Sequence, residues 1–182
     1  MRVIAGTRKG RELSAPKGMN TRPTLAKVKE AMFGMIQFDI EGAEVLDLFA
    51  GSGSLGIEAL SRGAKHAVFC DADRQAVSVI KDNLKRLDFI NEASVYYGDS
   101  LKLLDTIGTR FNIVLLDPPY ESGLETEAVR LLDEKALLEP GAIVLAEHSK
   151  EVPPVFTEAY TVLKTKKYGD TYVTYAVYKE VR

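Results

Sequence analysis

The chain has 182 residues, of which 46% are hydrophobic and 27% charged, and its formal net charge at pH 7 is −2. This length predicts one domain plus a short extension, and the composition is ordinary for a soluble globular protein. No run of about 18 apolar residues is present, so we predict neither a transmembrane helix nor a membrane partner. The N-terminus lacks a signal-peptide-like apolar segment, and the one cysteine, Cys70, excludes an internal disulfide. We therefore expect a cytoplasmic protein, and a monomer.

Basic residues gather at the start of the chain. Residues 1–40 hold eight Lys or Arg against three Asp or Glu, so residues 41–182 carry a net negative charge. Residues 2–15 predict a short hairpin with a basic tip, and such a tip favours contact with a polyanion. The candidates for RNA contact are Arg8, Lys9, Arg11 and Arg22. A solvated, charged surface explains the same pattern, and charge alone does not decide between the two.

A helix is predicted to follow this basic stretch. Pro23 suits its first turn, and apolar residues recur at helical spacing after it. We interpret the stripe as core packing rather than as a cofactor site. Its members are Leu25, Val28, Met32, Met35 and Ile36.

The stretch Val45–Gly56 predicts a buried strand over Val45–Phe49, then a glycine turn and the start of a helix. Gly51 and Gly53 allow backbone conformations closed to other residues, and free N–H groups at the helix start face the same space. The spacing matches the dinucleotide fingerprint, which is a weak signal alone and is also met by a turn that only connects strand to helix. Asp47, in the preceding strand, would disfavour a pyrophosphate but suits the sulfonium and ammonium groups of S-adenosylmethionine.

Strands and helices alternate along the rest of the chain. Further strands are expected over His66–Cys70, Ala93–Tyr97, Phe111–Leu116 and Ala142–Ala146, and a helix over Leu101–Ile107. The pair Gly169-Asp170 between Tyr160–Tyr168 and Thr171–Tyr178 predicts a hairpin. Five strand–helix units followed by a hairpin predict a seven-stranded sheet with one antiparallel strand, the methyltransferase variant of the doubly wound α/β fold.

Acidic residues follow two of these strands. Asp71 is placed where a carboxylate can accept both ribose hydroxyls of a nucleoside, a position that serves NAD and S-adenosylmethionine alike. Asp73 is a candidate for a helix N-cap or for a ligand contact, and the sequence does not decide between the two. Asp99 could accept from the adenine amino group while the Ser100 N–H meets a ring nitrogen. It could equally cap the next helix, and one residue can do both.

The tetrapeptide Asp117-Pro118-Pro119-Tyr120 follows another strand, beside the glycine turn. An exocyclic amine on a base is a poor nucleophile because its lone pair is delocalised into the ring. The Asp117 carboxylate and the Pro118 carbonyl can each accept one of its N–H groups, and Tyr120 offers a flat face to a base lifted out of its stack. The structural alternative is a turn that merely ends the strand.

Taken together, five motifs resemble the RsmD-like family of bacterial 16S ribosomal RNA guanine-N2 methyltransferases. They are Arg22-Pro23-Thr24, Glu30-Ala31-Met32-Phe33, the run from Leu46 to Gly56, Asp117-Pro118-Pro119-Tyr120 and Tyr168-Gly169-Asp170-Thr171. The resemblance implies a class I (Rossmann-like) methyltransferase domain over residues 41–182, preceded by an N-terminal extension of a basic hairpin and a helix over residues 1–40.

The same resemblance implies S-adenosyl-L-methionine as cofactor and one guanine of 16S rRNA as substrate, as naked RNA or within an assembling small ribosomal subunit. It implies Asp117, Pro118 and Tyr120 as the residues at the base. It implies a cofactor site formed by Asp47, Phe49, Gly51, Gly53, Asp71, Ala72, Asp99 and Ser100, with Thr24 and Arg22 closing over the methionine end. No metal site is predicted.

Three other functions fit part of the sequence. A DNA adenine-N6 or cytosine-N4 methyltransferase would use the same tetrapeptide but normally carries a separate target-recognition domain, for which we find no room. An NAD-dependent oxidoreductase would explain the glycines and Asp71, but neither Asp47 nor the two prolines. A non-catalytic RNA-binding module would need only the basic residues. Glu147 and His148 close a later strand; Glu147 has no assigned role, and His148 is interpreted as structural.

Overall fold

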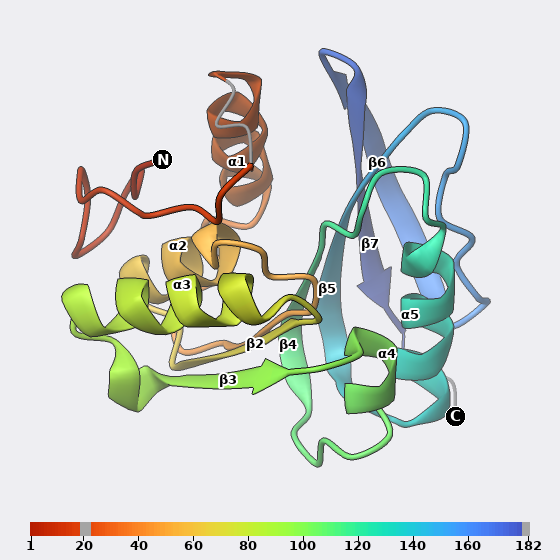
Figure 1. Cartoon of the computed structure of the whole chain (residues 1–182). Helices are drawn as coiled ribbons and strands as arrows, with labels where there is room; N and C mark the ends of the chain where they lie inside the picture. The colour runs from red at the N-terminus through yellow and green to blue at the C-terminus, as the bar shows by residue number, and fades with distance from the viewer. Residues whose placement is uncertain (19–22, 180–182) are drawn as a thin grey trace.

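The computed structural model describes residues 1–18 and 23–179, and a twisted seven-stranded sheet runs through it (Figure 1). The strands lie in the order β3-β2-β1-β4-β5-β7-β6. They are β1 (Glu44–Asp47), β2 (His66–Asp71), β3 (Ala93–Tyr97), β4 (Phe111–Leu116), β5 (Leu138–His148), β6 (Tyr160–Tyr168) and β7 (Thr171–Tyr178). Strand β7 inserts between β5 and β6 and is antiparallel to both. The predicted seven-stranded sheet with one antiparallel strand is therefore confirmed.

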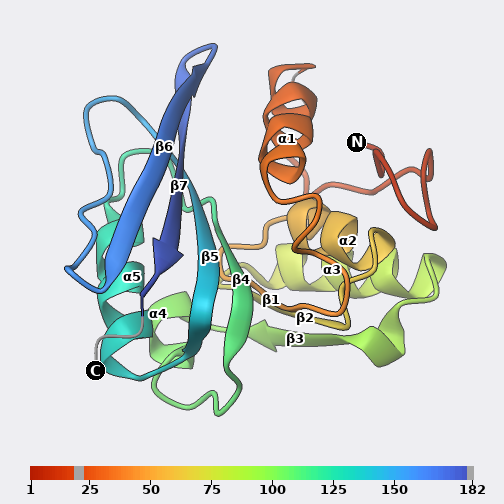
Figure 2. The same ribbon diagram turned by 180° about the vertical axis from the view of Figure 1, so that it is seen from behind.

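Helices cover both faces of the sheet, as Figures 1 and 2 show. Helices α1 (Pro23–Met35), α2 (Ser54–Ser61) and α3 (Arg74–Arg86) cover one face, and α4 (Ser100–Leu103) and α5 (Leu124–Glu134) cover the other. A short 3-10 helix, η1 (Ile90–Glu92), precedes β3. Apolar side chains point alternately to the two faces of the central strands and pack into two cores, one on each face. Within the described residues, no helix is long and apolar enough to cross a membrane.

The N-terminal extension packs onto the first of these cores. Val3, Leu13 and Met32 are buried in the same apolar cluster as Val45 of β1. The predicted hairpin forms an isolated bridge between Arg2 and Glu12 rather than two regular strands.

A glycine fixes the path of this extension across the end of α2. Gly6 has φ +82°, and a Cβ atom there would lie 1.8 Å from the carbonyl oxygen of Ser61. The next residue, Thr7, donates its N–H to the same oxygen at 2.7 Å. Close approach and backbone conformation both require glycine at this position.

Three predicted boundaries differ from the structure. Strand β1 ends at Asp47 because the chain then leaves the sheet for the glycine turn, where Gly51 and Gly53 adopt positive φ. Helix α4 covers Ser100–Leu103 rather than Leu101–Ile107. Strand β5 begins at Leu138 rather than at Ala142, and its pairing with β4 is irregular there.

Candidate active site

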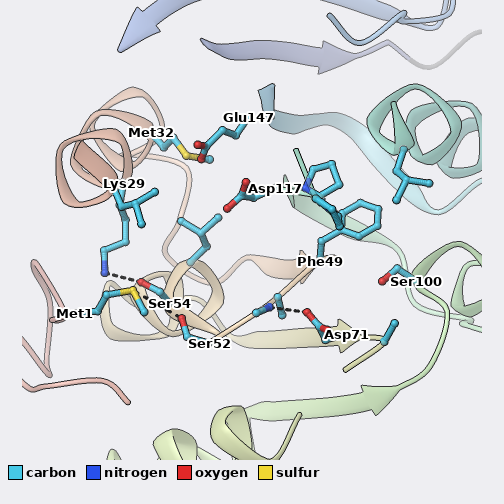
Figure 3. A pocket seen from close by; sticks show the side chains of 18 of the residues that line it. Met1, Lys29, Met32, Phe49, Ser52, Ser54, Asp71, Ser100, Asp117 and Glu147 are labelled. Atoms are coloured by element: carbon cyan, nitrogen blue, oxygen red, sulfur yellow. Dashed lines mark hydrogen bonds between the residues drawn. The ribbon is translucent and has the colours of Figure 1, made fainter. Parts of the chain in front are cut away.

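A cavity of about 1020 Å³ opens at the carboxyl ends of the central strands (Figure 3). The glycine turn after β1 forms its floor, and residues after β2, β3 and β4 form its sides. Helix α1 and the first residues of the chain close the remaining side. This is the crevice in which open α/β sheets bind their ligands.

The glycine turn and the end of β2 are hydrogen-bonded to each other. Gly51, with φ +56°, donates its backbone N–H to Oδ2 of Asp71 at 2.8 Å, and the Asp73 N–H donates to Oδ1 at 2.9 Å. Asp71 and Ala72 both border the cavity. A carboxylate has about four acceptor positions, so two N–H groups leave capacity for ribose hydroxyls. The predicted position of Asp71 beside the turn is confirmed, and its ribose contact stays a prediction.

Asp47 lies behind this turn rather than on the cavity wall. Its side chain is fully buried, and Oδ2 accepts the backbone N–H of Gly56 at 2.9 Å. Among the described residues Oδ1 has no hydrogen-bond partner. Burial raises the pKa of Asp47 to about 7, the Gly56 hydrogen bond opposes the shift, and the charge of Asp71 adds to it. Asp47 therefore supports the turn from beneath, and its direct contact with a cationic ligand stays a prediction.

Asp99 caps α4 at the adjoining wall. Its Oδ1 accepts the backbone N–H groups of Leu101 at 2.9 Å and Lys102 at 3.1 Å. Asp99, Ser100 and Phe49 all border the cavity. The N-cap alternative is thus confirmed for Asp99, and because both bonds use one oxygen, the carboxylate retains capacity for an adenine amino group.

Asp117 and Pro118 form the wall opposite, directly after β4, and Tyr120 lies just beyond them. Water reaches Asp117, but the surrounding protein restricts its hydration and raises the pKa of its carboxyl well above the ordinary value. The charge of Glu147, which projects into the same part of the cavity (Figure 3), adds to that shift. Smaller contributions come from Asp47 and Glu125.

A second, smaller cavity of about 110 Å³ adjoins the first. Asp117, Pro118 and Glu147 border both, whereas Tyr120 and Thr171 border only the smaller one. Tyr120 is 69% exposed. The tetrapeptide therefore spans the boundary between the deep cavity and the open surface, and the stacking role of Tyr120 stays a prediction.

His148, beside this smaller cavity, has a structural environment. Its Nε2 is 2.8 Å from Oγ1 of Thr174, and its Nδ1 is 2.7 Å from the carbonyl oxygen of Ser149. The ring also stacks on Tyr172 with 5.9 Å between centroids. Both ring nitrogens are thus occupied, which agrees with the interpretation made from the sequence.

Beyond the closing role implied for Thr24 and Arg22, the sequence did not predict that Met1, Arg2 and Lys29 form part of the cavity wall. Nζ of Lys29, a buried residue, donates to the carbonyl oxygen of Arg2 at 2.8 Å and to Oγ of Ser54 at 2.9 Å (Figure 3), and lies 3.3 Å from Oε2 of Glu58. Burial lowers the pKa of Lys29, and Glu58 opposes that shift. The α1 stripe is core packing at Val28, Met32 and Ile36, as predicted, although Met32 also borders the cavity. Leu25 differs from the prediction, because it is exposed and borders the cavity.

Two of the predicted RNA-binding arginines are engaged at the far end of α3. Nε of Arg8 donates to the carbonyl oxygen of Leu87 at 2.7 Å, and its guanidinium lies 4.8 Å from the ring centroid of Phe89. Nη2 of Arg11 donates to the carbonyl oxygen of Arg86 at 3.5 Å. Cations stabilise helix C-termini, so the structure gives these arginines a structural role.

RNA contact by Arg8, Lys9 and Arg11 stays a prediction. The predictions for Arg22 and for the side chain of Thr24 lie outside what the structure describes.

The strand order, the single antiparallel strand and the cavity beside the glycine turn define a class I methyltransferase fold. An Escherichia coli structure, YhhF, provisionally named a methyltransferase, superposes with a TM-score of 0.91 at 31% identity, covering 100% of this chain and 99% of that one. A Salinibacter ruber RNA methyltransferase solved with S-adenosyl-L-homocysteine has a TM-score of 0.67 at 18% identity over 90% of this chain and 96% of that one, and it shares the fold.

Sequence comparison narrows the class to a family. The family described as Conserved hypothetical protein 95 matches residues 1–178. YlbH of Bacillus subtilis, provisionally named an rRNA methyltransferase, is 45% identical over 99% of both chains. Ribosomal RNA small subunit methyltransferase D of Haemophilus influenzae is 39% identical over 98% of this chain and 93% of its own. The chain belongs to this RsmD-like methyltransferase family.

Proposed function

We propose that this protein transfers a methyl group from S-adenosyl-L-methionine to the exocyclic N2 amino group of one guanine in 16S rRNA. The observation that carries the proposal is the position of Asp117 and Pro118, on the wall of a nucleoside-sized cavity that begins at the glycine turn. Relatives that match 83% to 98% of the chain bear the name of a small-subunit rRNA methyltransferase, which supports the same substrate class.

The cavity fits the cofactor in charge as well as in size. Asp71 would hold the ribose, Asp99 and Ser100 would meet the adenine, and Phe49 borders the same space. The carboxyls of Asp117 and Glu147 have raised pKa values, chiefly through restricted hydration, so a bound cation would stabilise their ionised forms. A pyrophosphate would have the opposite effect, which argues against a dinucleotide. When bound, S-adenosylmethionine supplies a methyl carbon activated by a sulfonium.

The side chains around Asp117 are suited to an amine that gains positive charge. The Asp117 carboxylate and the Pro118 carbonyl each accept one N–H, which orients the nitrogen lone pair toward the cofactor side of the cavity. Tyr120, exposed at the cavity rim, stacks on the flipped base. Once nitrogen carries positive charge it is acidic, so its proton passes to Asp117 or to water without a strong base.

The experiment offers the purified protein three substrates: protein-free 16S rRNA, small ribosomal subunits from cells that lack this methylation, and DNA of the same sequence. Mass spectrometry of the nucleosides should reveal N2-methylguanosine in RNA or in subunits, and Asp117→Ala should slow its formation about a hundredfold or more. Methylated adenine or cytosine in DNA would instead support the DNA methyltransferase. RNA binding with no transfer to any of the three substrates would support the non-catalytic module.

A further inference from the structure

Three exposed lysines lie close together on β6, the edge strand of the sheet. They are Lys164, Lys166 and Lys167. Among the described residues none of the three forms an ion pair with a carboxylate, whereas Lys65 and Lys135 elsewhere do. The hairpin therefore carries concentrated positive charge that the protein itself leaves unneutralised, in a chain whose net charge is −2.

The tip of this hairpin adjoins the candidate active site. Thr171, the first residue of β7, borders the smaller cavity together with Asp117 and Tyr120. Its Oγ1 donates to Oε1 of Glu147 at 3.2 Å. In Figures 1 and 2 the hairpin and α1 project to the same side of the molecule, beyond the carboxyl ends of the central strands. A strand that delivers a base to Tyr120 would therefore lie next to this tip.

Aromatic rings accompany two of the lysines. Nζ of Lys166 lies 5.3 Å from the ring centroid of Tyr168, and Nζ of Lys167 lies 5.9 Å from that of Tyr172. Tyr172 in turn stacks on His148, which is buried. Lysines beside aromatic rings combine contacts for phosphates with flat faces for bases, as proteins that bind single strands do.

The cavity itself has the opposite charge. Asp117 and Glu147 line it, and their carboxylates would repel the phosphates of a polynucleotide. A base can enter such a site only if its backbone is held outside by cations. Arg8 and Arg11 of the N-terminal arm do not meet this need, because they bind carbonyl oxygens at the end of α3. Arg2 does border the cavity, but it pairs with Glu12.

We propose that the β6–β7 hairpin is the arm that holds the RNA backbone next to the target base, with Lys164, Lys166 and Lys167 contacting its phosphates. This inference rests on the proposed function in one respect, because it takes RNA as the molecule that the hairpin binds. A rival explanation is that lysines on an edge strand prevent it from pairing with other chains. Another is that β6 pairs with a second copy, since Val162 and Leu163 on the same strand are 48% and 57% exposed.

The test compares the wild type with Lys164→Ala/Lys166→Ala/Lys167→Ala in binding a protein-free 16S rRNA transcript across a KCl series. Each lost phosphate contact should reduce the salt slope by about 0.7, so the triple variant should flatten it by about 2 and weaken binding roughly tenfold or more at about 50 mM salt. The control Lys65→Ala/Lys102→Ala/Lys135→Ala removes equal charge from exposed positions outside the hairpin. It should leave the slope nearly unchanged.

Two further measurements separate the possible failures. Equal slopes for the hairpin and control variants would overturn the inference, whether or not the wild type methylates RNA. A selective loss of slope in a protein that methylates no rRNA would support the hairpin and overturn the proposed function. Gel filtration with light scattering measures whether β6 pairs with a second copy. If the wild type and the control variant are dimers, the hairpin variant is a monomer and RNA binding is unchanged, β6 is a homodimer interface and the inference is overturned.

Discussion

Replacing the buried carboxyl beneath the glycine turn should change how stability depends on pH. Asp47 is fully buried, and burial raises its pKa from 3.8 to about 7. The folded protein therefore binds the Asp47 proton more tightly than the unfolded chain does. The stability that this proton contributes is fully present below about pH 4 and is lost as the pH rises through about 7. Asp47→Asn, which carries no titratable group there, should lack this component of the pH dependence.

The size of the effect follows from the pKa difference. A shift of about three pKa units corresponds to on the order of 4 kcal/mol, because each unit is worth about 1.4 kcal/mol. Roughly 2 to 3 kcal/mol of this falls between about pH 5 and about pH 8. The Asn amide also places a buried N–H where Oδ1 has no partner among the described residues, which costs about 1 to 3 kcal/mol. That cost is the same at both pH values and cancels in the comparison.

The assay is urea unfolding of both proteins at about pH 5 and about pH 8. The stability of Asp47→Asn relative to the wild type should rise by roughly 2 to 3 kcal/mol between the two. Val68→Ala serves as the control, because it is a buried substitution without a titratable group on the strand paired with β1. It should lower the free energy of unfolding by the same amount at both pH values. If Asp47→Asn and the wild type differ in free energy of unfolding by the same amount at both pH values, the reasoning is refuted.

The other predictions concern the site and the N-terminal arm. Asp117→Ala should cut turnover a hundredfold or more with cofactor affinity nearly intact, and wild-type turnover should rise with pH as this carboxyl, whose pKa is raised, ionises. Tyr120→Phe should be mild and Tyr120→Ala severe in steady-state kinetics, because stacking needs the ring and not the hydroxyl; equal effects would argue against stacking. Asp71→Ala should weaken S-adenosylmethionine binding by about 1.5 to 3 kcal/mol in calorimetry, and an unchanged affinity would remove Asp71 from the ribose site. Arg8→Ala should lower the free energy of unfolding by about 1 to 2 kcal/mol and Lys9→Ala should not, because Arg8 loses its bond to a carbonyl oxygen and its ring contact.

The sequence predicted the features that depend on neighbouring residues. Glycine turns, strand ends and helix caps are local, so Gly51, Asp73 and Asp99 lie where the pattern placed them. The hairpin around Gly169 also has the predicted bounds. In each case a few adjacent residues contain the whole signal.

The features that the sequence did not predict depend on contacts between distant segments. Arg8 contacts the carbonyl oxygen of Leu87, 79 positions away, so nothing near Arg8 indicates that its guanidinium is engaged. The ion pair of Lys29 and Glu58 likewise joins two separate helices, α1 and α2. The burial of Asp47 behind the turn was also not predicted, because its place in the motif does not reveal on which side of the turn its side chain lies.

The most direct test of the central claim maps methyl groups on 16S rRNA from cells with and without the gene for this protein. One guanine should carry an N2-methyl group only when the gene is present. The gene should restore it, whereas a stable, correctly folded Asp117→Ala variant should not. Identical methylation maps from the two strains, or a gene-dependent methyl group on an adenine or a cytosine, would contradict the account.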